Sequence, residues 1–275
     1  MFFEARVAAF WIFCAWLAGG CGIALTAQEA RAQDAKAMVR QAVQTELAAD
    51  KNDHSRWLYF EEDKRPKHGV TQWVADTNQG SVHRVLAKDG RKLSPAEQKS
   101  PMDDFVKSPS EQAKQRKSGQ HDDEQATELL KLLPDAFVWT DAGEKNGNRM
   151  LHFKSDMNFH PSNREAKVFA AMEGDMAVDA GQHRIVSLKG RLVRDVRFGG
   201  GLFATLKAGG TFDVERRQTG AGVWQITETH VHIDGHALLF KSIAEQEDDV
   251  KSKFKQLPGD ISLERAEQEL LRQTE

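Results

Sequence analysis

Cysteine is nearly absent from this 275-residue chain, and both copies, Cys14 and Cys21, lie close to the N-terminus. The rest of the chain therefore has no disulfide, no thiol nucleophile and no cysteine-based metal site. An excess of charge is lacking too, because 38 lysines and arginines stand against 41 aspartates and glutamates. Nucleic-acid-binding domains usually carry a basic excess, so nucleic acid is not expected as a partner.

Long apolar runs are missing except at the N-terminus, where residues 7–27 read VAAFWIFCAWLAGGCGIALTA. Arg6 precedes the run, and small residues that suit cleavage end at Ala27 and Ala32. This order is typical of a secretory signal, so we expect residues 1–32 to be removed and the protein to be periplasmic or secreted. A retained membrane anchor is the alternative. We expect no transmembrane segment in the mature chain.

Cys21 offers another interpretation of the same segment. A bacterial lipoprotein signal ends with an aliphatic residue, two small residues and a cysteine that becomes lipidated. Ala18-Gly19-Gly20-Cys21 follows this order, with alanine in the aliphatic position. Lipidation would anchor the protein to an envelope membrane through an acyl chain.

The N-terminal part of the mature chain combines one helix with strands. Apolar residues at three-and-four spacing predict an amphipathic helix over residues 33–50. This apolar stripe includes Glu46. Aromatic and β-branched residues predict strands over 56–60, 70–77 and 81–87.

The middle of the chain changes character and then turns to strands. Residues 93–120 are polar, charged and contain three prolines, so we expect a charged helical or flexible excursion. A helix is expected over 122–133, ended by Pro134. From Ala136 onward, short strands separated by short turns predict an antiparallel meander, and a final helix follows Ser262.

These patterns together predict a mainly β (α+β) fold. We expect a single domain over residues 33–275, built on a large curved antiparallel sheet or incomplete β-barrel. The N-terminal, middle and C-terminal helices are expected to pack against this sheet.

Glycine is concentrated in the segment GGGLFATLKAGG, residues 199–210. A phosphate-binding loop would need a helix directly after its glycines. The residues that follow Gly201 are too few for such a helix before the next strand. We therefore interpret the glycines as corners of a connection between antiparallel strands, and no cofactor is expected.

Histidines are concentrated in THVHIDGH, residues 229–236. This segment is similar, with one inserted glycine, to the HxHxDH signature of metallo-β-lactamase-like hydrolases, in which His230, His232, Asp234 and His236 would hold zinc. No histidine follows His236, so further ligands are missing. Asp234-Gly235 instead predicts a hairpin that pairs Ile233 with His236. His230 and His232 stay weak metal candidates, and with no GxSxG motif we expect no metal, no catalytic residue and no enzyme.

The order of strands and glycines over residues 168–243 carries a family resemblance. An apolar strand ends at Val178-Asp179, another at Phe198-Gly199, and the glycine corner leads to Gly210-Thr211-Phe212 and a strand with Trp224. This order resembles the LolA/LolB-type fold of periplasmic lipoprotein carriers, the outer-membrane lipoprotein-sorting proteins. The charged segment 93–120 departs from that pattern.

The resemblance implies an incomplete barrel whose helices cover a concave apolar face that holds lipid chains. The implied function is an exported, non-enzymatic protein that carries or senses a lipid or lipoprotein acyl chain, with a lipid or lipidated protein as partner. The alternative is a structural or protein-interaction envelope protein on the same fold, anchored at Cys21, with an envelope protein as partner. Candidate residues for the cavity, each of which would otherwise be ordinary core, are Trp57, Tyr59, Trp73, Phe137, Trp139, Phe153, Val196, Phe198, Phe212 and Phe240.

Overall fold

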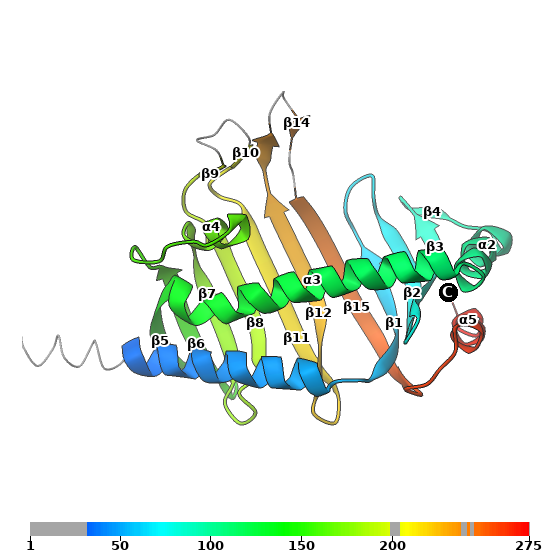
Figure 1. The fold of residues 1–275 in the computed structure, drawn as a ribbon, viewed down its shortest axis with the longest axis horizontal. Helices are drawn as coiled ribbons and strands as arrows, with labels where there is room; N and C mark the ends of the chain where they lie inside the picture. The colour runs from blue at the N-terminus through cyan, green and yellow to red at the C-terminus, as the bar shows by residue number, and fades with distance from the viewer. Residues whose placement is uncertain (1–31, 199–203, 238–240, 243–244, 275) are drawn as a thin grey trace, which may run out of the picture.

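The fold is built on one large antiparallel sheet (Figure 1). The computed structural model describes residues 32–198, 204–237, 241–242 and 245–274. Within these residues, eleven strands pair in the order β4-β3-β2-β1-β15-β12-β11-β8-β7-β6-β5, and the sheet does not close. The predicted mainly β fold with an incomplete barrel is confirmed. In chain order, the strands are β1 (Arg56–Asp63), β2 (Val70–Thr77), β3 (Gly80–Lys88), β4 (Arg91–Lys92), β5 (Phe137–Lys145), β6 (Asn148–Ser155), β7 (Met172–Asp179), β8 (Ile185–Leu192), β11 (Thr211–Gly220), β12 (Val223–Ile233) and β15 (Glu245–Leu257).

Strand β15 joins two meanders that are distant in the sequence. Strands β1 to β4 pair each with the next along the chain, and so do β5 to β8. Strand β15 pairs antiparallel with β1 on one side and with β12 on the other. The first strands of the chain therefore lie beside its last strands in one continuous sheet.

A small second sheet lies beyond the end of β12 (Figure 1). Strands β9 and β10 pair antiparallel on either side of residues 199–203, with Ala204 opposite Phe198. Gly209, in the next turn, has a φ of 89°, which glycine adopts without steric cost. The antiparallel pairing of β9 with β10 agrees with the predicted connection, while Gly199, Gly200 and Gly201 themselves lie outside the described residues. The strands of this sheet are β9 (Val196–Phe198), β10 (Ala204–Leu206), β13 (Gly235–Ala237) and β14 (Lys241–Ser242).

The hairpin predicted at Asp234-Gly235 is wrong. Residues 228–233 of β12 pair with β15, and β13 leaves for the small sheet, where His236 lies opposite Thr205. The backbone N–H of Lys207 donates to the carbonyl of Asp234 at 2.7 Å, which ties the turn to the end of β10. The turn signal identified the bend correctly, but pairing with the longer strand β15 satisfies more backbone groups than a short hairpin would.

Two helices cross one face of the large sheet (Figure 1). The first, residues 32–52, confirms the amphipathic helix predicted over 33–50. The second, α3 (Pro109–Ala136), includes the predicted helix 122–133 and continues past Pro134. Pro134 lacks the N–H that would bond within the helix, and α3 ends two residues after it. The prediction that Pro134 ends the helix is therefore wrong by two residues.

The segment 93–120 is helical rather than a flexible excursion. It forms α2 (Pro95–Val106) and the first part of α3. The hydroxyl of Ser94 accepts a hydrogen bond from the backbone of Glu97, whose carboxylate accepts one from Ser94 in return. Ser108 caps α3 through the backbone N–H of Glu111. These caps begin both helices despite their polar composition.

Two separate hydrophobic cores hold the helices on the sheet. The first packs helix 32–52 and the C-terminal end of α3 against β5 to β8. The second packs α2 and α5 (Leu263–Leu271) against β1 to β3. Helix α5 begins after Ser262, whose side chain accepts from the backbone of Arg265, as the sequence predicts. A short helix, α4 (Arg164–Phe169), precedes β7.

The register of the strands defines one side of the sheet, here called the cavity side. Residues directly opposite each other on paired strands share a side. One row of such residues is Leu151, Met176, Leu188, Val214, Thr229, Asp249 and Asp63. The next row is Trp139, Phe153, Gly174, Gly190, Phe212, Val231 and Glu247. The cavity side is thus apolar over β5 to β11 and becomes acidic over β15 and β1.

Candidate ligand cavity

A cavity of about 950 Å³ lies between the cavity side of the sheet and the two crossing helices. The sheet contributes β5 to β8, β11 and β12, and the helices contribute residues 46–53 and 123–133. This volume is near the upper end of small-molecule sites, which span roughly 300 to 1,000 Å³. The cavity is therefore large enough for a long, flexible ligand.

The lining of the cavity is mostly apolar. Helix α3 contributes leucines along one face, because Leu129, Leu130 and Leu133 recur at helical spacing. Along β11, Phe212 and Val214 alternate with residues of the opposite side. An apolar ligand would replace water against these side chains, which is favourable in proportion to the area covered.

Two glycines on neighbouring strands make room for the aromatic rings in this lining. Gly174 and Gly190 are directly opposite each other, flanked by Phe153 and Phe212. A Cβ on Gly174 would lie 2.0 Å from the backbone oxygen of Lys189, and a Cβ on Gly190 would lie 2.5 Å from the ring of Phe212. Only glycine fits at both positions, which leaves room for the two rings close to the strands.

A buried ionic triad interrupts the apolar wall. Oε1 of Glu46 accepts from Nε of Arg184 at 3.1 Å and from the backbone N–H of Ile185 at 2.7 Å. Oε2 accepts from Nη2 of Arg184 at 2.9 Å and pairs with Nη1 of Arg216 at 2.5 Å. The exposed fractions of the side chains of Glu46, Arg184 and Arg216 are only 6%, 9% and 19%.

The two arginines keep Glu46 ionised. Burial raises the pKa of Glu46, but the hydrogen bonds from Arg184, Arg216 and the backbone of Ile185, together with the charge of Arg216, outweigh it and hold the pKa below its ordinary value. Arg184 also donates to the carbonyl of Gly222 at 3.3 Å, and Arg216 to that of Trp224 at 3.4 Å. The triad therefore links helix 32–52 to β8, β11 and the turn before β12.

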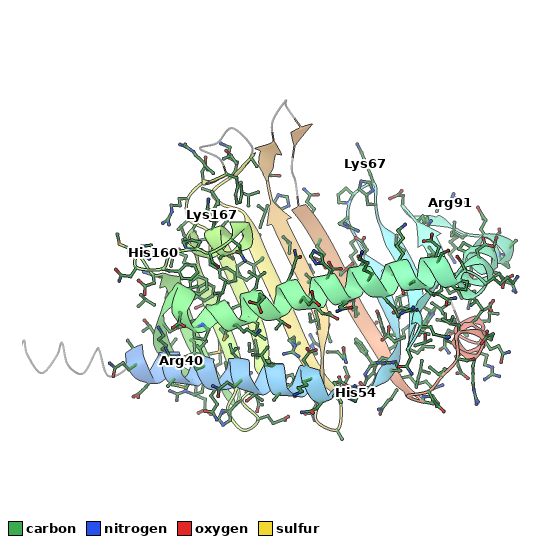
Figure 2. All side chains as sticks on the ribbon, in the orientation of Figure 1. Arg40, His54, Lys67, Arg91, His160 and Lys167 are labelled. Carbon is green, nitrogen blue, oxygen red and sulfur yellow. The ribbon has the colours of Figure 1, made fainter. Side chains whose placement is uncertain are left out.

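An acidic rim lies beside the triad. Asp50 lines the cavity one helical turn beyond Glu46, Asp53 lines it directly after the end of this helix, and Asp123 of α3 lines it as well. Burial, followed by the charges of Asp50 and Asp122, raises the pKa of Asp123. Figure 2 marks this end of the helix with His54, where the chain turns into β1. The cavity thus carries positive charge in its wall and negative charge at its rim.

Six of the ten candidate residues belong to this part of the fold. Phe137, Phe153 and Phe212 line the cavity. Trp139 and Val196 are buried in the core beneath it, and Phe198 packs against that core.

Three further candidates lie elsewhere. Trp57 and Tyr59 of β1 both contact Phe254, at ring distances of 6.2 and 5.4 Å. Trp73 belongs to the second core, where its indole N–H donates to the carbonyl of Thr274 at 3.1 Å. The tenth candidate, Phe240, lies outside the described residues.

The residues of the triad were missed by sequence reasoning. Glu46 occupies a position in the apolar stripe of its helix, and a charged residue in such a stripe is the signal that could have pointed to it. Arg184 and Arg216 show no comparable pattern, because they meet Glu46 only through the tertiary fold.

The histidines of β12 make ordinary side-chain pairs. Nδ1 of His230 lies 2.7 Å from a carboxylate oxygen of Asp248, and Nε2 of His232 lies 3.8 Å from Asp234. In the part of the chain that the structure describes, no group of three or more His, Cys, Asp or Glu side chains could hold a metal ion.

No family model matches the chain, and no curated protein or solved structure matches it either. Among the described residues, no helix is long and apolar enough to span a membrane.

Proposed function

We propose that this protein is an exported, non-enzymatic binding protein that carries or senses a lipid or an acyl chain in the cavity, in the manner of the LolA/LolB-like carriers that its sequence resembles. The observation that carries the proposal is a mostly apolar cavity of about 950 Å³ beneath two helices. Its apolar walls suit an acyl chain, whose binding gains about 0.8 kcal/mol for each methylene removed from water.

Neutral n-alkanols of increasing length test the cavity without involving the charge of a headgroup. We expect the affinity to rise about fourfold for each added methylene until the chain fills the cavity. Isothermal titration calorimetry on the purified protein, with alkanols from decanol to octadecanol, measures this series. An affinity that does not depend on chain length would reject the proposal.

A matched pair of variants locates the site. Leu188 lines the cavity, so Leu188→Trp is expected to fill part of it and weaken binding of the longest alkanols at least tenfold. Val138 on the edge strand β5 is 50% exposed, so Val138→Trp adds the same side chain away from the cavity. Equal binding by both variants would show that the alkanols bind somewhere else.

Export and cargo can be examined together on protein taken from a bacterial periplasm without detergent. Its denatured mass is expected to show cleavage after Ala27 or Ala32, or else an acyl addition at Cys21. Its native mass is expected to exceed the denatured mass by an amount in the range of a lipid. If protein taken from lipid-rich cells has a native mass with no added material, the alternative of a protein-interaction role is favoured.

A further inference from the structure

We propose that the ligand of the cavity is an amphiphile with an anionic group at the end of its acyl chain, and that Arg216, supported by Arg184, binds this group. The inference rests on the proposed function, because it names the class of ligand for the same cavity. The shared chemistry is a carboxylate or a phosphate monoester attached to a long alkyl chain.

The first argument is the charge balance of the triad. Two guanidinium groups stand against the single carboxylate of Glu46. Among the described residues, neither Arg184 nor Arg216 has a second carboxylate within 4.0 Å. Both oxygens of Glu46 already accept two contacts each, so Glu46 has no capacity left for more donors. One positive charge in the cavity wall is therefore left without a protein counter-charge.

The second argument is burial. A charge that is removed from water is costly unless an opposite charge faces it. Arg184 and Arg216 are both largely buried, and both line the cavity. Of the two, Arg216 makes fewer contacts with the protein, since it pairs with Glu46 and donates a long hydrogen bond to Trp224. Its planar fork of donors matches a carboxylate or phosphate better than an alcohol.

The third argument is the order of the groups along the cavity. On β11, Phe212, Val214 and Arg216 follow one another on the cavity side, from apolar to cationic. On helix 32–52, Glu46 is followed one turn later by Asp50 at the acidic rim. An anionic group at the rim would meet like charge, whereas at Arg216 it meets opposite charge. The favoured pose places the head at Arg216 and the chain toward Phe212 and Phe153.

The experiment compares three probes with the same alkyl chain on the full purified protein at pH 7.5: hexadecanol, palmitate and hexadecyl phosphate. A hydrogen bond to a charged partner adds enough affinity to make an anionic probe about ten- to a hundredfold tighter than hexadecanol. Tighter binding of palmitate would indicate that the ligand is a fatty acid, and tighter binding of hexadecyl phosphate would indicate a lipid phosphate. Isothermal titration calorimetry below the critical micelle concentration of each probe gives the three dissociation constants.

Variants on one strand assign the effect to Arg216. Arg216→Gln is expected to reduce the preference for the anions over hexadecanol to less than threefold, and Arg216→Lys is expected to keep part of the preference. Arg217 is the matched control, because it is 65% exposed on the opposite side of β11 and pairs with Glu215 and Glu228. Arg217→Gln is expected to bind all three probes as the unchanged protein does.

The outcomes separate this inference from the proposed function. Equal affinity for hexadecanol and both anions in the unchanged protein overturns the inference and leaves the lipid-binding proposal standing. Failure of all three probes to bind rejects both. A preference for anions that survives Arg216→Gln would assign the anion to another site and also overturn the inference. If Arg216→Gln does not fold, the comparison of probes on the unchanged protein and on Arg216→Lys decides.

Discussion

The cavity side of the sheet has two halves with contrasting chemistry on a continuous backbone. Over β7, β8 and β11, the directly opposed residues are Met176, Leu188 and Val214, and they lie beneath the cavity and its two helices. Over β15 and β1, the same row continues with Asp249 and Asp63. We call these regions the apolar half and the acidic half.

The pKa values of two carboxylates, Glu46 in the apolar half and Asp249 in the acidic half, are shifted in opposite directions. In the apolar half, Glu46 is held by two arginines, and its pKa is lowered. In the acidic half, burial raises the pKa of Asp249 to about 6, and the nearby carboxylates of Glu61, Asp63 and Glu247 add to this effect. Lys251 opposes them, and Arg65 pairs with Asp63 in the same region. The comparison shows that Glu46 lies between two cations in the cavity wall, whereas Asp249 lies among other carboxylates.

The largest effect is expected from Glu46→Gln in the apolar half. Removing the carboxylate leaves two largely buried guanidinium groups without a counter-charge, which typically costs about 3 to 5 kcal/mol of the free energy of unfolding. The measurement is urea denaturation at pH 7.5.

Glu61→Gln in the acidic half is the matched change. Glu61 is also buried and pairs with Lys251 at 3.4 Å, but its loss relieves repulsion from its acidic neighbours. We expect a loss below about 1 kcal/mol. Equal losses for Glu46→Gln and Glu61→Gln would remove the electrostatic contrast between the halves.

The second effect concerns the packing of the apolar half. Gly174→Ala would place a Cβ 2.0 Å from the backbone oxygen of Lys189, so the paired strands β7 and β8 must separate. The expected loss is about 3 kcal/mol, at the upper end of overpacking effects. Urea denaturation measures it, with Gly119→Ala as control.

Gly119 lies within helix α3, and an added Cβ there would have nothing within 4 Å. Gly119→Ala is therefore expected to raise the free energy of unfolding by up to about 1 kcal/mol through helix propensity alone. A stable Gly174→Ala variant would mean that the strands of the apolar half can yield, and that the rings over them are not fixed by close packing.

The elements of this fold could largely be predicted from the sequence because their signals are local. The apolar stripe of helix 32–52 and the cap at Ser262 are examples. Pairings between distant strands could not be predicted, as the pairing of β1 with β15 shows.

Only some of the residues that line the cavity could be predicted from the sequence. Phe137, Phe153 and Phe212 are aromatic residues on strands, and each was a candidate before the structure was known. Arg184 and Arg216 lie 138 and 170 positions from Glu46, so no local pattern records that the three side chains meet. A chemical contrast such as that between the two halves depends on which strands become neighbours, and this is a property of the tertiary fold.

The smallest effect is expected from Asp249→Asn in the acidic half, and it depends on pH. Asp249 has a folded pKa of about 6 against an ordinary value of 3.8, so ionisation of this group destabilises the folded state. The cost is absent below about pH 4, grows as the pH rises through 6, and is complete above it. Because the group is half exposed, the full cost is discounted to about 1 kcal/mol.

Asp249→Asn is therefore expected to be more stable than the unchanged protein by this amount at pH 7.5 and to lose the advantage at pH 4. The difference between the two proteins at each pH, measured by urea denaturation, cancels the titration of all other groups. Asp248→Asn, on the opposite side of β15 beside His230, is the control and should give no such gain. A gain that does not vary with pH would mean that ionisation of Asp249 is not its cause, and the electrostatic contrast between the halves would lose this support.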